Sequence, residues 1–165
     1  KIVVNLANTV TSLVGQGYRP IDDLSALQRI LSKTLAEGVR IVEAAGYRSH
    51  RIGSVPGFGL IRAMDRLPAF LTRAAFARNL DKMVRSSMSQ DLFQRGRHDT
   101  ELESLTGYIL RLAAESGVAA PWNEGIYQIA KERFAMAEFR PLEASSLLAS
   151  LQRRMALPQA SPFRQ

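Results

Sequence analysis

The stretch KIVVNLANTVTSLV, residues 1–14, carries the pattern on which the fold depends. On a helical wheel with about 100° per residue, one side is apolar. This apolar side consists of Ile2, Val3, Leu6, Ala7, Val10, Leu13 and Val14. The opposite side is polar and consists of Lys1, Asn5, Asn8, Thr9 and Ser12. The spacing predicts an amphipathic helix that buries its apolar side in a core.

The polar side of this helix is unusual for a surface that faces only water. Asparagine and threonine are poor helix formers, but they provide directional hydrogen-bond donors and acceptors. From the residues alone two interpretations stay open: the polar side lines a ligand pocket, or it is simply exposed. No capping residue precedes Ile2, so we expect the element to be cut at residue 1 and more polypeptide to have preceded it.

The same helical spacing recurs along the rest of the chain, whereas the period-two alternation of strands is rare. Helices are expected at about 1–15, 22–46, 58–66, 68–84, 100–117, 122–138 and 142–156. Glycine and proline fall between these segments, as is typical of turns. The sequence therefore predicts one all-α domain over residues 1–156 and a tail over residues 157–165.

Composition narrows the classes of site that this chain can carry. With 46% hydrophobic and 22% charged residues, the 165-residue chain has the composition of a folded globular domain. It contains no cysteine, which excludes disulfides, thiolate nucleophiles and cysteine-based zinc sites. The two histidines, His50 and His98, are far apart in sequence, so no structural metal is expected.

Charge and hydropathy limit the kinds of partner that this chain is expected to bind. The net charge of +7 comes from scattered basic residues, which does not support a nucleic-acid groove. No uninterrupted apolar run approaches the roughly 18–20 residues of a membrane span, so we expect no membrane segment and a cytoplasmic location. A strand followed by G-x-G-x-x-G is also missing, which leaves this chain without an evident dinucleotide site.

A second candidate position is Glu101. Thr100 and Glu103 have capping-box spacing, which predicts that a helix starts near Thr100. The apolar stripe of this helix consists of Leu105, Tyr108, Ile109 and Leu112. On the wheel Glu101 projects into this stripe, and an inward carboxylate must be paired or have a raised pKa, as acid/base and ligand-binding groups do. The alternative is a glutamate that only interacts with the helix dipole.

These residues together resemble the C-terminal domain of the ketopantoate reductases, also called 2-dehydropantoate 2-reductases. The resemblance covers most of the chain and rests on KIVVN at 1–5, Ser87-Met88, Gln90-Asp91-Leu92, Gly96-Arg97, Thr100-Glu101 with Gly107, and Pro121 with Asn123. Each motif is weak alone, but their shared order is fairly specific. The resemblance implies a multi-helix fold like the C-terminal domain of 6-phosphogluconate dehydrogenase.

The resemblance also implies an enzyme activity. In this family a Rossmann domain binds NADPH, and hydride passes to the ketone carbon of a 2-keto acid such as ketopantoate, in pantothenate and coenzyme A biosynthesis. Lys1 matches the lysine that stabilises and protonates the developing alkoxide, a task that suits a positioned ammonium group. Glu101 matches the glutamate beside the nicotinamide and the substrate, so it is expected to be catalytic and to contact the cofactor.

The expected substrate-binding residues are Asn5, Asn8, Thr9 and Ser87. Asn5 and Ser87 match family positions directly. Thr9 stands where the family usually has a second asparagine, and Asn8 lies just before it. Two other departures are a spacing from Asp91 to Glu101 that is longer by two residues, and Thr106 in place of a common asparagine. The departures leave the identity of the substrate open.

Three functions follow from the residues and the resemblance. The first is the substrate-binding and dimerisation domain of an NADPH-dependent reductase, a homodimer whose N-terminal Rossmann domain is absent from this chain; alone, the chain is expected to be inactive. The alternative is a non-catalytic helical dimerisation or interaction module. A nucleic-acid module comes third.

Overall fold

The computed structural model describes residues 1–48, 57–80, 87–94 and 101–156. Its helices are α1 (Ile2–Val14), α2 (Leu24–Ala44), α3 (Phe58–Arg66), α4 (Ala69–Leu80), α5 (Ser87–Gln94), the π-helical turn η1 (Glu103–Gly107), α6 (Tyr108–Glu115), α7 (Pro121–Phe134) and α8 (Ala144–Ala156). Within these ranges the only β-type pairing is one isolated bridge between Gln16 and Arg19. The prediction of an all-α fold is confirmed.

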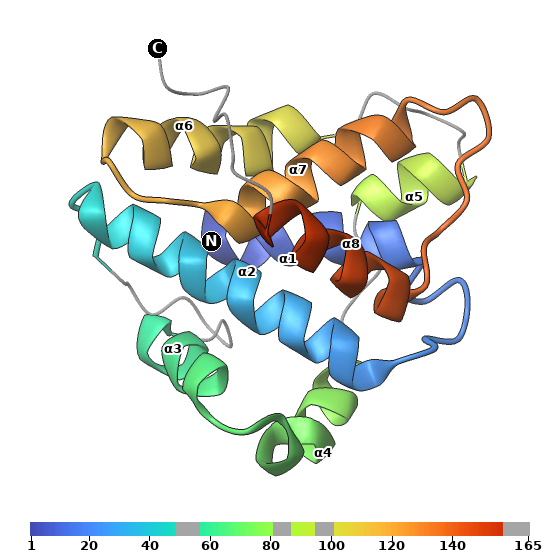
Figure 1. The fold of residues 1–165 in the computed structure, drawn as a ribbon, viewed down its shortest axis with the longest axis horizontal. Coiled ribbons are helices and arrows are strands. Elements are labelled where there is room, and N and C mark those ends of the chain that lie inside the picture. The colour runs from blue at the N-terminus through green and yellow to red at the C-terminus, as the bar shows by residue number, and fades with distance from the viewer. Residues whose placement is uncertain (49–56, 81–86, 95–100, 157–165) are drawn as a thin grey trace.

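The long helix α2 runs through the middle of the domain and organises the other helices around it (Figure 1). It contacts α1, α3, α4, α6, α7 and α8. In Figure 1, α6 and α7 lie above α2, while α3 and α4 lie below it. Helix α5 packs against α1.

Close packing between α1 and α2 forms the centre of the core. Val3, Leu6 and Val10 of α1 are buried, as the wheel predicts. A Cβ atom added at Gly38 of α2 would lie 2.5 Å from Leu6 Cδ1, so the glycine permits this close approach. Burying a leucine or valine side chain stabilises a fold by about 1.5–3 kcal/mol.

The N-terminus of α7 is capped by a residue of another helix. Ala120, which precedes α7, has no side chain that could cap it. Instead the carboxylate of Glu37, on α2, accepts hydrogen bonds from the backbone N–H of Trp122 (3.2 Å) and of Asn123 (2.8 Å), and from Asn123 Nδ2 (2.8 Å). Burial raises the pKa of the Glu37 carboxyl, although these hydrogen bonds act in the opposite direction. Glu37 therefore joins α2 to α7 by a buried polar contact.

The N-terminus of α8 is capped in the same way from the loop before α2. Asp22 accepts hydrogen bonds from the backbone N–H groups of Ala144 (2.6 Å) and Ser145 (3.2 Å) and from Ser145 Oγ (2.7 Å). Its neighbour Asp23 caps α2 itself, through the N–H groups of Ser25 and Ala26. The helix expected at about 22–46 thus begins at the Asp23 cap, whereas Asp22 caps a helix far along the chain.

Other boundaries differ from the sequence-based expectation. Helix α5 was not expected, because its serine-rich start has low helix propensity; its packing, with Met88 fully buried, stabilises it. Helix α4 is described up to Leu80, and residues 81–84 of the expected helix 68–84 lie outside the described residues. His50, His98, Thr100 and the tail 157–165 lie outside the described residues.

Candidate functional site

The polar side of α1 divides into an accessible part and an enclosed part. Lys1 is exposed, and Asn5 and Asn8 are half-buried. Thr9 and Ser12, by contrast, are both 0% exposed. The interpretation of a merely exposed polar side is therefore wrong for Thr9 and Ser12, and both interpretations stay open only for the accessible part.

The accessible part, which we call the α1 edge, consists of Lys1, Asn5 and Asn8. The side chains of these three residues form no hydrogen bond or ion pair with another described residue. Asn5 follows Lys1 by one helical turn, since its N–H donates to Lys1 O at 3.2 Å. The edge therefore offers one ammonium group and two amides to a ligand.

In the enclosed part of the polar side of α1, the hydroxyl groups pair with hydroxyl groups from two other segments. Thr9 Oγ1 lies 3.0 Å from Thr106 Oγ1 in η1, and Ser12 Oγ lies 2.8 Å from Ser89 Oγ in α5. Direct contact between Thr9 and a substrate, as the resemblance implies, would require Thr9 to leave this buried environment. We therefore do not include Thr9 in the accessible surface.

Ser87 is the first residue of α5, and its side chain lies outside the described part of the structure. Because Ser89 of the same helix forms a hydrogen bond with Ser12 of α1, the backbone at Ser87 is held near α1. The sequence analysis missed Ser89, although a second serine two positions after Ser87 was a visible signal.

The expectation that Glu101 faces inward is wrong for this chain. Glu101 is exposed, and Leu102 and Thr106 occupy the buried positions instead. The wheel assumed an α-helical period, but η1 is a π-helical turn, with a different number of residues per turn. The main chain of Glu101 is nevertheless fixed, because Glu101 O accepts hydrogen bonds from Leu105 N–H and Ser104 Oγ, both at 3.0 Å.

A hydrogen bond between Glu103 and Tyr127 attaches the π-helical turn to α7. The Tyr127 hydroxyl donates a short hydrogen bond to Glu103 Oε1. Burial, together with this carboxylate, raises the pKa of Tyr127 to about 12. A Cβ atom at Gly107 would lie 2.8 Å from Glu103 Oε2, so the glycine leaves space for the carboxylate. π-helical turns are rare and often occur at functional sites, and no wheel predicted this one.

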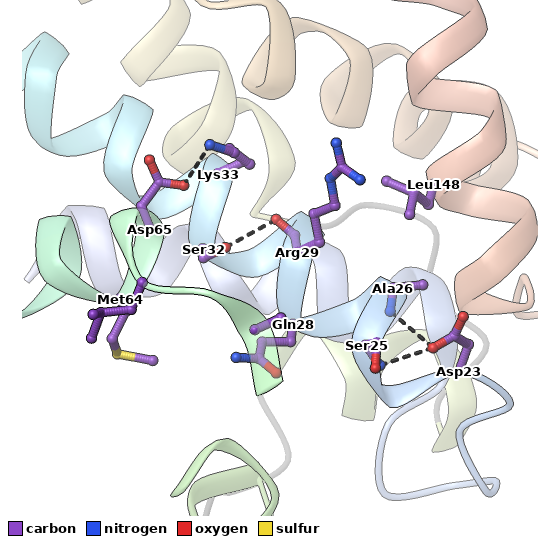
Figure 2. Close-up of a pocket in the computed structure, with 12 residues that line it drawn as sticks. Asp23, Ser25, Ala26, Gln28, Arg29, Ser32, Lys33, Met64, Asp65 and Leu148 are labelled. Carbon is purple, nitrogen blue, oxygen red and sulfur yellow. Dashed lines mark hydrogen bonds and ion pairs between the residues drawn. The ribbon is translucent and has the colours of Figure 1, made fainter. Parts of the chain in front are cut away.

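A surface depression of about 450 Å³ lies elsewhere, between α2, the α3–α4 connection and α8 (Figure 2). Three of its charged groups have partners, since Lys33 Nζ lies 3.0 Å from Asp65 Oδ1 and Asp23 caps α2, while the side chain of Arg29 forms no hydrogen bond or ion pair with a described residue. None of the expected site residues lines it. We therefore place the candidate site at the α1 edge, where the polar side chains have no partner among the described residues.

Two other kinds of site are absent from the described ranges. No cluster of three or more histidine, aspartate or glutamate side chains there could hold a metal ion. None of the helices in those ranges combines the length and the apolar character needed to cross a bilayer.

Comparison with known proteins identifies relatives of the chain. The family model for the C-terminal domain of the ketopantoate reductase PanE/ApbA matches residues 1–134, which extend from α1 through α7. A 2-dehydropantoate 2-reductase of Vibrio cholerae serotype O1 is 44% identical over 43 residues. That segment is 26% of this chain and only 14% of the relative's length. No solved structure gives a significant match.

Proposed function

This chain belongs to the ketopantoate reductase family as a C-terminal helical domain, and from this we propose that it is the substrate-binding half of an NADPH-dependent 2-keto acid reductase. The proposed reaction is the reduction of ketopantoate to pantoate, in pantothenate and coenzyme A biosynthesis. The observation that carries the proposal is the α1 edge, where one ammonium group and two amides share a helix face and have no partner among the described residues.

In the proposed mechanism Lys1 acts at the ketone oxygen of the substrate. NADPH, when bound, supplies a hydride to the ketone carbon. As negative charge develops on the oxygen, the Lys1 ammonium group stabilises it and donates a proton from Nζ, which yields the hydroxyl of the product. The amides of Asn5 and Asn8 offer donors and acceptors to the carboxylate and hydroxyl groups of the substrate.

In this proposal the cofactor would be held mainly by an N-terminal Rossmann domain of the whole protein. Within the described residues, Glu101 suits a contact with it: the residue is exposed and its main chain is fixed at the start of η1. A carboxylate there accepts a hydrogen bond from an N–H or O–H group of cofactor or substrate. We propose Ser87, at the start of α5, as a further substrate-binding residue.

The decisive experiment measures NADPH oxidation by ketopantoate in the full-length protein. Replacing Lys1 with alanine is expected to lower kcat at least ~100-fold, the usual scale for losing an acid/base group. Lys33→Ala is the matched control, because it removes the same charge from an ion pair in the distant depression. An unchanged rate in the Lys1 variant would exclude a catalytic role for Lys1.

A sequence test is independent of activity. The proposal requires a strand and a G-x-G-x-x-G turn roughly 150–180 residues upstream of Lys1, in accordance with the size of a Rossmann domain. An upstream region without this motif would contradict the reductase assignment.

The second candidate is a non-catalytic dimerisation or interaction module. It is favoured by the exposed apolar side chains on and between α3 and α4, which are Leu60, Leu67, Phe70 and Leu71, because clustered exposed apolar groups often mark contact surfaces. We propose a homodimer in the cytoplasm in either case. Sedimentation of the full-length protein tests the dimer, and a dimer that reduces no 2-keto acid would favour this candidate.

A further inference from the structure

We propose that two buried hydroxyl pairs, Thr9–Thr106 and Ser12–Ser89, position the active site from within. In this assignment they are positioning residues that hold η1 and α5 against α1. They thereby keep the segments that carry Glu101 and Ser87 at a fixed distance from the α1 edge. The inference rests on the proposed function and explains why only part of the polar stripe is accessible.

Burial makes the two pairs specific for one arrangement of the helices. Thr9 and Ser12 are 0% exposed, Thr106 is 1% exposed and Ser89 is 2% exposed. A buried hydroxyl that loses its hydrogen bond costs free energy, because water cannot replace the partner. If η1 slid along α1, Thr9 and Thr106 would lose the 3.0 Å contact together. The pairs therefore favour one register of η1 and α5 on α1.

Each segment has a second contact away from its hydroxyl pair. In α5, Phe93 stacks on Tyr18 with ring centroids 4.4 Å apart and meets Phe139 edge-on at 5.2 Å. In η1, Glu103 accepts a hydrogen bond from the Tyr127 hydroxyl of α7. These contacts attach the segments to the domain, whereas the hydroxyl pairs set where they lie relative to α1.

The pairs lie close in sequence to the residues that they would position. Ser89 follows Ser87 by two residues in the same short helix. Thr106 follows Glu101 by five residues, and the Leu105 N–H just before it donates to Glu101 O. A shift at Ser89 or Thr106 is thus transmitted directly to Ser87 or Glu101. The two pairs should affect different kinetic constants, because Ser87 is assigned to substrate and Glu101 to cofactor and substrate.

The experiment compares variants of the full-length protein in the NADPH oxidation assay. Thr9→Val, which keeps the side-chain shape, is expected to lower kcat/KM about 10- to 100-fold, the scale of a misplaced reacting group. Ser12→Ala is expected to raise KM for ketopantoate about tenfold while KM for NADPH is unchanged. Thr9→Ser, which keeps the hydroxyl, should restore the rate.

Thr11→Val is the matched control. Thr11 is also a buried threonine of α1, but its Oγ1 donates to Ala7 O at 2.9 Å within the same helix. It should therefore show wild-type kinetics. Thr9→Val kinetics equal to those of Thr11→Val, or no rescue by Thr9→Ser, would overturn the assignment.

Two further outcomes are informative. If Thr9→Val fails to fold, the double variant Thr9→Val/Thr106→Val replaces it, since removing both partners leaves no unpaired hydroxyl in that pair. Normal kinetics in the double variant would overturn the positioning role. If the wild-type protein oxidises no NADPH with any 2-keto acid, the proposed function fails and this assignment fails with it. An active wild type with unaffected variants overturns the inference alone.

Discussion

Helices α1, α7 and α8 on one hand, and α3 and α4 on the other, all pack on α2, but they are attached to it by different means. The first group, which we call the capped core, has buried apolar faces, and carboxylates from elsewhere cap α7 and α8. The second group, the α3–α4 arm, buries few side chains and is tied to α2 by the ion pairs Arg62–Glu43 and Lys33–Asp65.

The difference shows where the stability of the domain resides. A buried carboxylate such as Glu37, which accepts several hydrogen bonds, couples distant segments strongly, because removing it leaves N–H groups unsatisfied. Exposed ion pairs contribute only about 0–1 kcal/mol. The candidate site belongs to the capped core through α1. Substitutions in the core should therefore disturb folding and the site together, and those of exposed side chains in the arm should disturb neither.

The largest effect is expected for Glu37→Ala. This change leaves the N–H groups of Trp122 and Asn123 without their acceptor in the interior, and should lower the free energy of unfolding by about 2–4 kcal/mol. Urea denaturation followed by circular dichroism measures it. Glu37→Gln, which keeps one acceptor oxygen, should lose less. A loss below about 1 kcal/mol for the alanine variant would mean that the α7 cap contributes no more to stability than an ion pair of the arm.

A smaller effect is expected for Asp22→Ala. The α8 cap is at the surface, and losing a helix cap costs about 1 kcal/mol. Burial alone would raise the pKa of Asp22, but hydrogen bonds from Ser145 and from the N–H of Ala144 outweigh it and hold this pKa well below its usual range. The stabilisation is therefore present above the unfolded pKa of about 3.9 and is lost as the pH falls below it.

The pH dependence is the measurement for Asp22. The difference in free energy of unfolding between wild type and Asp22→Ala should be largest near neutral pH and should shrink on acidification. A difference that stays constant down to strongly acidic pH would contradict the charged cap.

The smallest effect is expected for Phe70→Ala in the arm. Phe70 is 76% exposed, so its replacement should change the free energy of unfolding by less than about 0.5 kcal/mol. Phe76→Ala is the control from the same helix, where the ring is buried, and it should destabilise several times more. Equal losses for the two variants would contradict the exposed position of Phe70.

The sequence predicted much of the fold because most of its signals are local. Helical spacing located seven of the helices, among them the α2 helix that begins at the Asp23 cap. Asp22 and Asp23 look alike in the sequence, yet one caps the helix that follows and the other caps α8. That distinction depends on a contact across 122 positions, which no local pattern encodes.

The candidate site was predicted less completely for a related reason. On the wheel Thr9 and Ser12 are equivalent to Asn5 and Asn8, and only packing by η1 and α5 determines which are covered. Glu101 was placed inward because a wheel cannot anticipate a π-helical turn. The catalytic and binding roles of these residues stay predictions, which the kinetic experiments test.

The contact between Asp22 and α8 also has a consequence for how the protein is made. On the ribosome, Asp22 emerges long before Ala144, 122 residues later, and at about 5–20 residues per second this delay lasts roughly 6–24 s. During that time the nascent α2 lacks α8, the helix that covers part of its surface in the folded domain. This early segment is therefore a natural substrate for chaperones until the last helix is synthesised.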